Sequence, residues 1–127
     1  MKYALIGCGR ISKNHLIASL SNDLEIVAIC DLVEEKMEAL LEEFHLEKND
    51  GIKKYSSYKK MIEETSPEIV SIATESGYHA QIALYCIEHK INVIIEKPMA
   101  MSIADADLII EKAKEKRVKV SACHQNR

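Results

Sequence analysis

The chain has 127 residues, of which 47% are apolar and 29% charged, and its net charge is −3. This length and composition are typical of one globular domain with a substantial hydrophobic core. Acidic and basic residues are interleaved, and only five tyrosines and one phenylalanine are aromatic. The sequence therefore argues against nucleic acid or an anionic membrane surface as a partner. No apolar run approaches the length of a transmembrane helix.

Strand-like and helix-like segments alternate along the chain. Short apolar, β-branched segments predict strands that are buried on both faces, and apolar residues at helical spacing predict helices that bury one side. The predicted strands span residues 2–6, 24–30, 52–55, 68–73, 91–95 and 118–123. Helices are predicted at residues 11–20, at 33–44, where apolar residues form a stripe, and at 78–89. Two further helices are predicted, a short one that Ser57 caps and that ends before Pro67, and a last one that Ser102 caps. In the last helix, the residues predicted to face inward are Ile103, Ala106, Ile109, Ile110 and Ala113.

This alternation predicts an α/β fold in which helices cover both faces of a doubly wound, mostly parallel sheet. The expected strand order is 3-2-1-4-5-6, the Rossmann arrangement, and residues 1–127 are expected to form one dinucleotide-binding domain. Ligands of such sheets bind beyond the carboxyl ends of the strands. The segments that should converge on this edge are residues 7–10, 31, 74–79, 96–98 and 124–127.

The first strand runs into Gly7-Cys8-Gly9-Arg10-Ile11-Ser12, a Gly-x-Gly-x-x-Ser turn that opens a helix. Gly7 permits a tight turn, Gly9 lets the backbone approach a phosphate, and Ser12 is small enough for close packing of helix and strand. The amides of the first helical turn then face an anion, helped by the helix dipole. The residues predicted to bind the phosphates are Gly7, Gly9, Arg10 and Ile11, with Arg10 contributing its backbone amide.

Asp31 ends the second predicted strand, 22 positions after Gly9. A carboxylate there can accept both hydroxyls of an adenosine ribose but repels a 2′-phosphate, and Leu32 and Val33 follow where an NADP site favours Arg or Ser. NAD is therefore favoured over NADP. Asp31 could also be the N-cap of the next helix, and the two roles are compatible, but ribose binding is the favoured one. The turn alone also fits FAD or S-adenosylmethionine.

Glu96-Lys97-Pro98 stops the fifth predicted strand, and Gln125 follows the sixth. These residues resemble the glucose–fructose oxidoreductase / inositol dehydrogenase / MocA family. The resemblance also includes the glycine turn with His15 after it, Asp31, and Ala73-Thr74 leading to His79. The resemblance covers all 127 residues, including the ending His124-Gln125-Asn126-Arg127. Its opening and ending are similar to the UDP-N-acetylglucosaminuronate 3-dehydrogenases within that family.

The resemblance implies hydride transfer between NAD and a hydroxyl carbon of a sugar, nucleotide sugar or cyclitol. Lys97 corresponds to the family's catalytic lysine, which reaches both the cofactor and the reacting hydroxyl. A positively charged nicotinamide disfavours a nearby ammonium group and so lowers the pKa of a lysine toward the range useful for proton transfer. Lys97 could instead only hold the hydroxyl, leaving a histidine of a second domain as the base.

The resemblance also implies cofactor contacts from Thr74, His79, Glu96 and Gln125. Thr74 could instead cap the next turn, His79 could brace the loop, and His15 is expected to be structural. Members of the family carry a second α/β domain after the sixth strand, which holds the substrate pocket and usually the oligomer interface. Such a domain is expected after Arg127, in a protein that forms homo-oligomers.

Two other function classes compete with the dehydrogenase. A non-catalytic NAD(H)-binding sensor or partner module would leave Lys97 without a task, and a methyltransferase that binds S-adenosylmethionine is disfavoured by the position of Glu96-Lys97-Pro98. The scattered cysteines (Cys8, Cys30, Cys86 and Cys123) lack the spacing of a metal site. They are expected to be reduced thiols of a cytoplasmic protein, with no bound metal.

Overall fold

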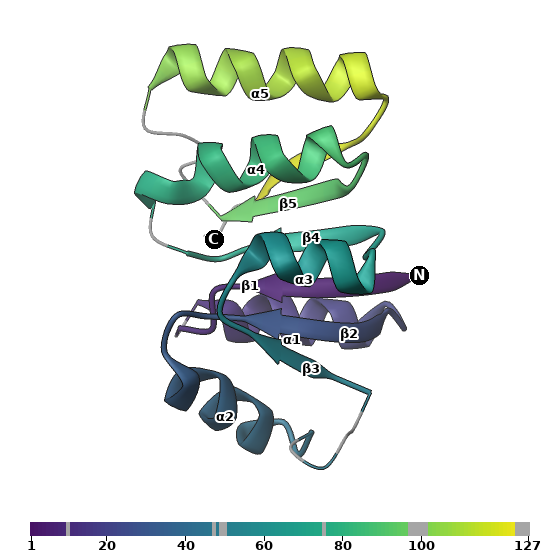
Figure 1. Cartoon of the computed structure of the whole chain (residues 1–127), viewed down its shortest axis with the longest axis vertical. Coiled ribbons are helices and arrows are strands. Elements are labelled where there is room, and N and C mark those ends of the chain that lie inside the picture. The colour runs from purple at the N-terminus through teal and green to yellow at the C-terminus, as the bar shows by residue number, and fades with distance from the viewer. Residues whose placement is uncertain (10, 47, 49–50, 75, 97–101, 124–127) are drawn as a thin grey trace.

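A computed structural model of the chain describes residues 1–9, 11–46, 48, 51–74, 76–96 and 102–123. These residues form a six-stranded sheet with the strand order β3-β2-β1-β4-β5-β6, in which every pair of neighbouring strands is parallel. Helices lie on both faces of the sheet (Figure 1). The predicted doubly wound fold and its strand order are confirmed.

The elements follow the predicted alternation. In chain order they are β1 (Lys2–Ile6), α1 (Ser12–Ser21), β2 (Glu25–Cys30), α2 (Glu34–Glu43), β3 (Lys53–Tyr55), α3 (Tyr58–Thr65), β4 (Ile69–Ile72), the short 3₁₀ helix η1 (Ser76–Tyr78), α4 (His79–Glu88), β5 (Asn92–Glu96), α5 (Ile103–Lys116) and β6 (Val120–Cys123).

Several predicted boundaries move by one or two residues because helix ends are set by local hydrogen bonds. The sixth strand begins at Val120 rather than at residue 118. Arg117 has a left-handed backbone with φ of 60°, and the amide of Val118 donates to the carbonyl of Ala113 at 3.0 Å, which closes α5. Both predicted serine caps are confirmed: Ser57 accepts from the amide of Lys60, and Ser102 accepts from that of Asp105.

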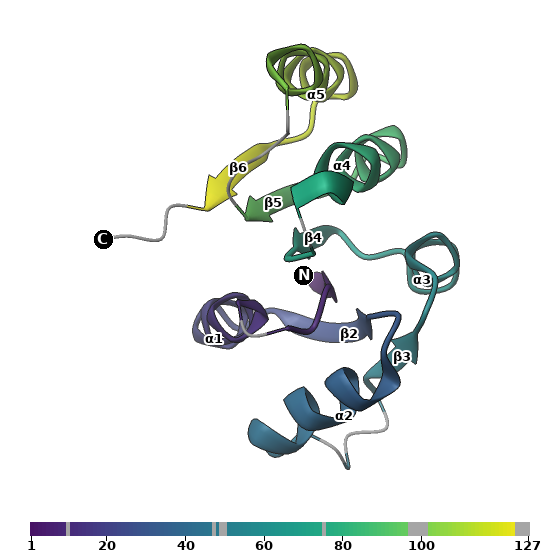
Figure 2. The same ribbon diagram turned by 90° about the vertical axis from the view of Figure 1, so that its left-hand side faces the viewer.

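Two hydrophobic clusters, one on each face, hold the helices against the sheet. In β1 alone, Ala4 and Ile6 belong to the cluster shared with α3, α4 and α5, whereas Tyr3 and Leu5 belong to the cluster shared with α1 and α2. Figure 2 shows these two sets of helices on opposite sides of the sheet. This two-sided burial explains why the strand sequences are nearly all apolar.

The predicted inner face of α5 is partly wrong. Ile109 and Ala113 are buried as predicted, but Ile103 is 82% exposed and Ile110 is 43% exposed. Consecutive helical residues point about 100° apart, so Ile109 and Ile110 cannot both face the same neighbour. Ile103 is the first residue of the helix.

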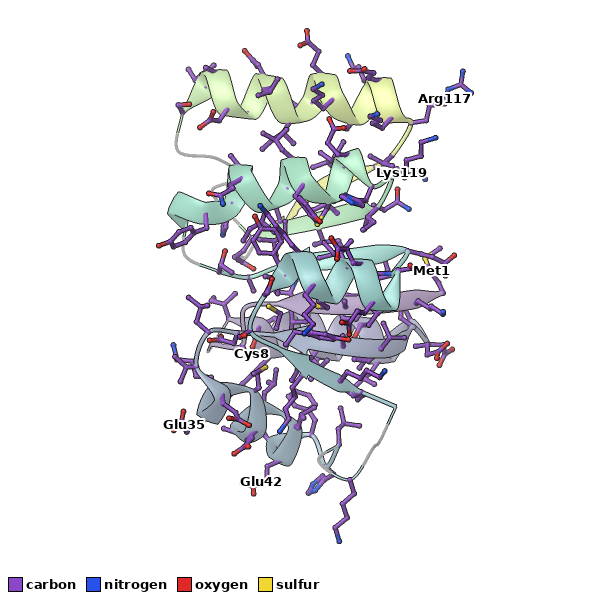
Figure 3. The ribbon with its side chains drawn as sticks, in the orientation of Figure 1. Met1, Cys8, Glu35, Glu42, Arg117 and Lys119 are labelled. Atoms are coloured by element: carbon purple, nitrogen blue, oxygen red, sulfur yellow. The ribbon has the colours of Figure 1, made fainter. Side chains whose placement is uncertain are left out.

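The two edges of the sheet differ in what they present. In Figure 3, Cys8 lies at the edge where the strands end, and Met1, Arg117 and Lys119 lie at the opposite edge. Glu35 and Glu42 of α2 point away from the sheet and are exposed (Figure 3). Among the described residues, no helix is both long and apolar enough to cross a membrane.

Candidate cofactor site

The turn after β1 is tightly packed at its first glycine. Gly7 has a φ of +97°, and a β-carbon there would lie 2.6 Å from the carbonyl carbon and oxygen of Ala73 and 2.8 Å from the amide nitrogen of Thr74. The amide of Gly7 donates to the carbonyl of Cys30 at 2.8 Å. Only glycine fits this position, for reasons of both backbone conformation and space.

Gly9, two residues later, is surrounded differently. A β-carbon at Gly9 would have no heavy atom of the described chain within 4 Å, and Gly9 is not among the residues with positive φ. Neither packing within these residues nor backbone conformation requires a glycine there. The open space beside Gly9 is what the close approach of a ligand to the backbone requires.

The helix that follows begins without a side-chain cap. Ser12 is fully buried, and both its hydroxyl and its amide donate to the carbonyl of Gly9, at 2.5 and 3.1 Å. Within the part of the chain that the structure describes, no side chain caps the N-terminus of α1, in contrast to α3 and α5. The amides of Ser12 and Asn14 donate to the backbone carbonyls of Gly9 and Ile11. What the first turn of α1 offers an anion is the positive end of the helix dipole, with no side-chain cap in competition.

Asp31 ties the end of β2 to the glycine turn. Its Oδ2 accepts from the amide of Cys8 and its Oδ1 from the amide of Val33, both at 2.8 Å. The alternative role as helix N-cap is wrong, because α2 begins at Glu34 and Val33 occupies the N-cap position. Beside Asp31, Leu32 is 86% exposed, an unusual position for a large apolar side chain next to a carboxylate.

The cysteines near this turn are neutral thiols. Burial, reinforced by the negative charge of Asp31, raises the pKa of Cys8 and of Cys30 to about 12, and burial alone raises that of Cys86 to about 12. All three are free cysteines, as the sequence predicted. Thiols with such pKa values are poor nucleophiles and poor metal ligands at neutral pH. No group of three or more His, Cys, Asp or Glu in the described ranges could hold a metal ion.

His79 braces the loop after β4. His79 is buried at the start of α4, and its Nε2 donates to the carbonyl of Thr74 at 2.8 Å. The backbone of Ala73 and Thr74 is the same segment that packs against Gly7. The geometry thus supports the bracing role that the sequence left open for His79. Contact of Thr74 or His79 with a cofactor stays a prediction.

Glu96, the last residue of β5, points into the protein and contacts α1. Its Oε1 lies 2.6 Å from Nε2 of His15, and both residues are buried. Because a carboxylate only accepts hydrogen bonds, we assign the proton to Nε2 of His15. Sequence reasoning assigned Glu96 to the cofactor and missed this pair. One signal for it existed, since Ser12, His15 and Ser19 recur at helical spacing on the inner face of α1.

The structure thus brings together the glycine turn, Asp31, the Thr74–His79 contact and Glu96 at one edge of the sheet. Arg10, Lys97 and Gln125 lie outside the described residues, as do Pro98 and residues 124–127. Their roles stay predictions.

A parallel 3-2-1-4-5-6 sheet with a glycine turn, an uncapped helix and an acid after the second strand defines the class of Rossmann dinucleotide-binding domains. Residues 1–124 match the oxidoreductase family with an NAD-binding Rossmann fold that is named GFO_IDH_MocA. The chain belongs to this family.

Individual relatives agree with that assignment. The WlbA dehydrogenase of Chromobacterium violaceum, solved in complex with NADH and UDP-GlcNAcA, has 29% sequence identity and a TM-score of 0.86, over 100% of this chain and 36% of that one. The WlbA dehydrogenase of Bordetella pertussis, with the same two ligands, has 31% identity and a TM-score of 0.85, over 100% and 38% of the two chains. The inositol 2-dehydrogenase of Salmonella paratyphi B is 31% identical over 113 residues, which are 87% of this chain and 32% of that protein.

The chain therefore spans about a third of the length of the curated relatives it matches. The family is one of oxidoreductases that bind NAD. This description gives no support to a non-catalytic sensor module, and it favours NAD over S-adenosylmethionine.

Proposed function

We propose that this chain is the cofactor-binding domain of an NAD-dependent dehydrogenase. The whole enzyme moves a hydride between NAD and a hydroxyl carbon of a sugar, nucleotide sugar or cyclitol, and a second domain completes its substrate pocket and its homo-oligomer. The observation that carries the proposal is the pairing of open space at Gly9 with the hydrogen bond that fixes Asp31 to the same turn.

The residues present fit a dinucleotide. The uncapped start of α1 would hold the diphosphate, and Gly9 would leave room for it. The backbone amides of Arg10 and Ile11 are proposed to contribute to this contact. The carboxylate of Asp31 keeps further lone pairs beyond its two amide bonds, so it can accept the ribose hydroxyls while it braces the turn. Its negative charge disfavours the 2′-phosphate of NADP.

The nicotinamide end would be served by residues after β4, β5 and β6, namely Thr74, His79, Lys97 and Gln125. Glu96, predicted from the sequence to contact the cofactor, would act through its bond to His15 directly before Lys97. Bound NAD supplies the hydride acceptor for oxidation, and its reduced form supplies the donor for the reverse reaction. With NAD bound, Lys97 would hold the reacting hydroxyl and, as a neutral amine, would take its proton at Nζ when the alcohol is oxidised. If Lys97 only holds the hydroxyl, the proton goes instead to a base of the second domain.

The substrate class rests on the relatives. Two of the solved relatives bind UDP-GlcNAcA and a curated relative is named inositol 2-dehydrogenase. Ring hydroxyls of a nucleotide sugar and of a cyclitol are chemically alike, so both are included in the proposal. The buried, neutral thiols fit a protein that works in the reducing cytoplasm.

The test uses the complete enzyme with NAD and a panel that includes myo-inositol and UDP-N-acetylglucosaminuronate, with reduced nicotinamide as the readout. We expect Lys97→Met to lower kcat by at least about 100-fold and to leave the Kd for NAD nearly unchanged. Lys119→Met is the matched control, because Lys119 is exposed at the opposite edge of the sheet. Turnover by Lys97→Met close to that of Lys119→Met would refute the role of Lys97.

A further inference from the structure

The buried face of α1 is unusually polar. The residues it buries are Ser12, His15, Leu16 and Ser19. The two serines satisfy their hydroxyls within their own helical segment, Ser12 on the carbonyl of Gly9 and Ser19 on that of Leu16 at 2.8 Å. His15 differs from them because it bonds to Glu96, 81 residues further along the chain.

Stability alone does not account for this contact. Removing a carboxylate and an imidazole from water is unfavourable, and a well-packed apolar pair of the same size is often equally stable or more stable. The 2.6 Å bond recovers part of this cost only in one relative arrangement of α1 and β5. What the pair supplies is a fixed distance between two elements.

Those two elements carry the two ends of the proposed site. α1 starts at the glycine turn that binds the diphosphate, and Glu96 is the last residue of β5, directly before Lys97 in the chain. In the sheet, β4 lies between β5 and β1, the strand that leads into α1. The His15–Glu96 bond joins residues 81 positions apart, so it is a direct link between segments that the backbone connects only through a long path.

We propose that His15 is a positioning residue of the dehydrogenase. Through Nε2 it holds the carboxylate of Glu96, and so it fixes the position of the backbone directly before Lys97 relative to the diphosphate site. This inference rests on the proposed function of Lys97. Displacing a reacting group by about 1 Å can slow a reaction about 100-fold, so the pair should affect the chemical step more than the binding of NAD.

The test compares three substitutions at His15 in the complete enzyme. Leucine removes the bond, asparagine keeps an amide but is too short to reach Glu96, and glutamine places an amide N–H close to the position of Nε2. His15 lines a cavity of about 350 Å³ beside Tyr3 and Ser71, so these side chains have room. Ser19→Ala is the matched control, because Ser19 is also buried, one turn later, and its hydroxyl donates to the carbonyl of Leu16 in the same helix.

We expect His15→Leu and His15→Asn to lower kcat about 10- to 100-fold. The Kd for NAD should stay within about threefold, and the isotope effect on kcat with deuterated substrate should rise. His15→Gln should recover most of the rate, and Ser19→Ala should match the wild type. If His15→Leu does not fold, the comparison of asparagine with glutamine decides. A Glu96→Leu variant should lose as much rate as His15→Leu, and the double variant no more than either.

Equal rates for the asparagine and glutamine variants, or a loss in kcat no larger than that of Ser19→Ala, would overturn the positioning role. So would losses that add in the double variant. Lys97→Met, measured in parallel, separates the two proposals. If Lys97→Met retains activity, the proposed function fails; if it is inactive while His15→Leu turns over normally, only this inference fails.

Discussion

The turn after β1 and the end of β5 reach the same edge of the sheet but are fixed by different means. The turn is held by steric limits and by backbone bonds, since Gly7 packs against Ala73 and its amide bonds to Cys30. The end of β5 is held by a bond between two side chains, His15 and Glu96. The first arrangement depends on the absence of a side chain, and the second depends on the presence of two. Substitutions should therefore affect the two regions in different ways.

The largest expected effect is on folding, at Gly7. Gly7→Ala forces a β-carbon to 2.6 Å from backbone atoms at a φ of +97°, so we expect it to lower the free energy of unfolding by about 3–5 kcal/mol. Urea unfolding measures this loss. Gly77→Ala is the control, because a β-carbon there meets nothing within 4 Å among the described atoms; it should change stability by less than about 0.5 kcal/mol. Similar losses for the two variants would show that Gly7 is not sterically required.

The next effect separates the two glycines of the turn. Gly9→Ala meets no described atom within 4 Å, so the free energy of unfolding should be nearly unchanged. The added methyl group occupies the space proposed for the diphosphate, and the Kd for NAD should rise at least about tenfold, equivalent to about 1.4 kcal/mol. Calorimetric titration measures the Kd, and thermal unfolding without NAD checks stability. A variant with wild-type affinity would mean that the dinucleotide does not approach Gly9.

The smallest effect is a pH dependence of the free energy of unfolding that arises from Cys8 in the glycine turn. The pKa of Cys8 is raised to about 12 from an ordinary value of 9.0, so the folded state retains a proton that the unfolded state releases. The stabilisation is fully present below about pH 9 and is lost as the pH rises toward 12. At pH 10 the loss is about 1.4 kcal/mol.

The measurement compares wild type with Cys8→Ala by urea unfolding at pH 8 and at pH 10. Between these two pH values, wild type should lose about 1.4 kcal/mol more than the variant. Because lysines and other thiols titrate in both proteins, the difference isolates Cys8. Parallel losses in the two proteins would contradict the raised pKa of Cys8.

The sequence predicted what depends on neighbours along the chain. The strands follow from runs of apolar residues, the caps of α3 and α5 from Ser57 and Ser102, and the glycine turn from its spacing. These features are decided within a few residues, and parallel pairing with right-handed crossovers then leaves few possible sheet orders. The need for glycine at position 7 was visible for the same reason.

The features that the sequence did not reveal depend on contacts across the fold. Nothing near His15 identifies Glu96 as its partner, and nothing near Asp31 shows that its carboxylate bonds to the amide of Cys8. The exposure of Ile110 likewise depends on which side of α5 faces α4. Such choices are made by packing between distant segments, and helical or strand periodicity alone leaves them open.

The most direct test of the central claim is a crystal structure of the enzyme with oxidised NAD. The account predicts diphosphate oxygens about 3 Å from the amides at the start of α1, directly over Gly9, and both adenosine ribose hydroxyls bonded to the carboxylate of Asp31. A diphosphate bound away from Gly9, or an Asp31 that bonds only to the amides of Cys8 and Val33, would contradict it.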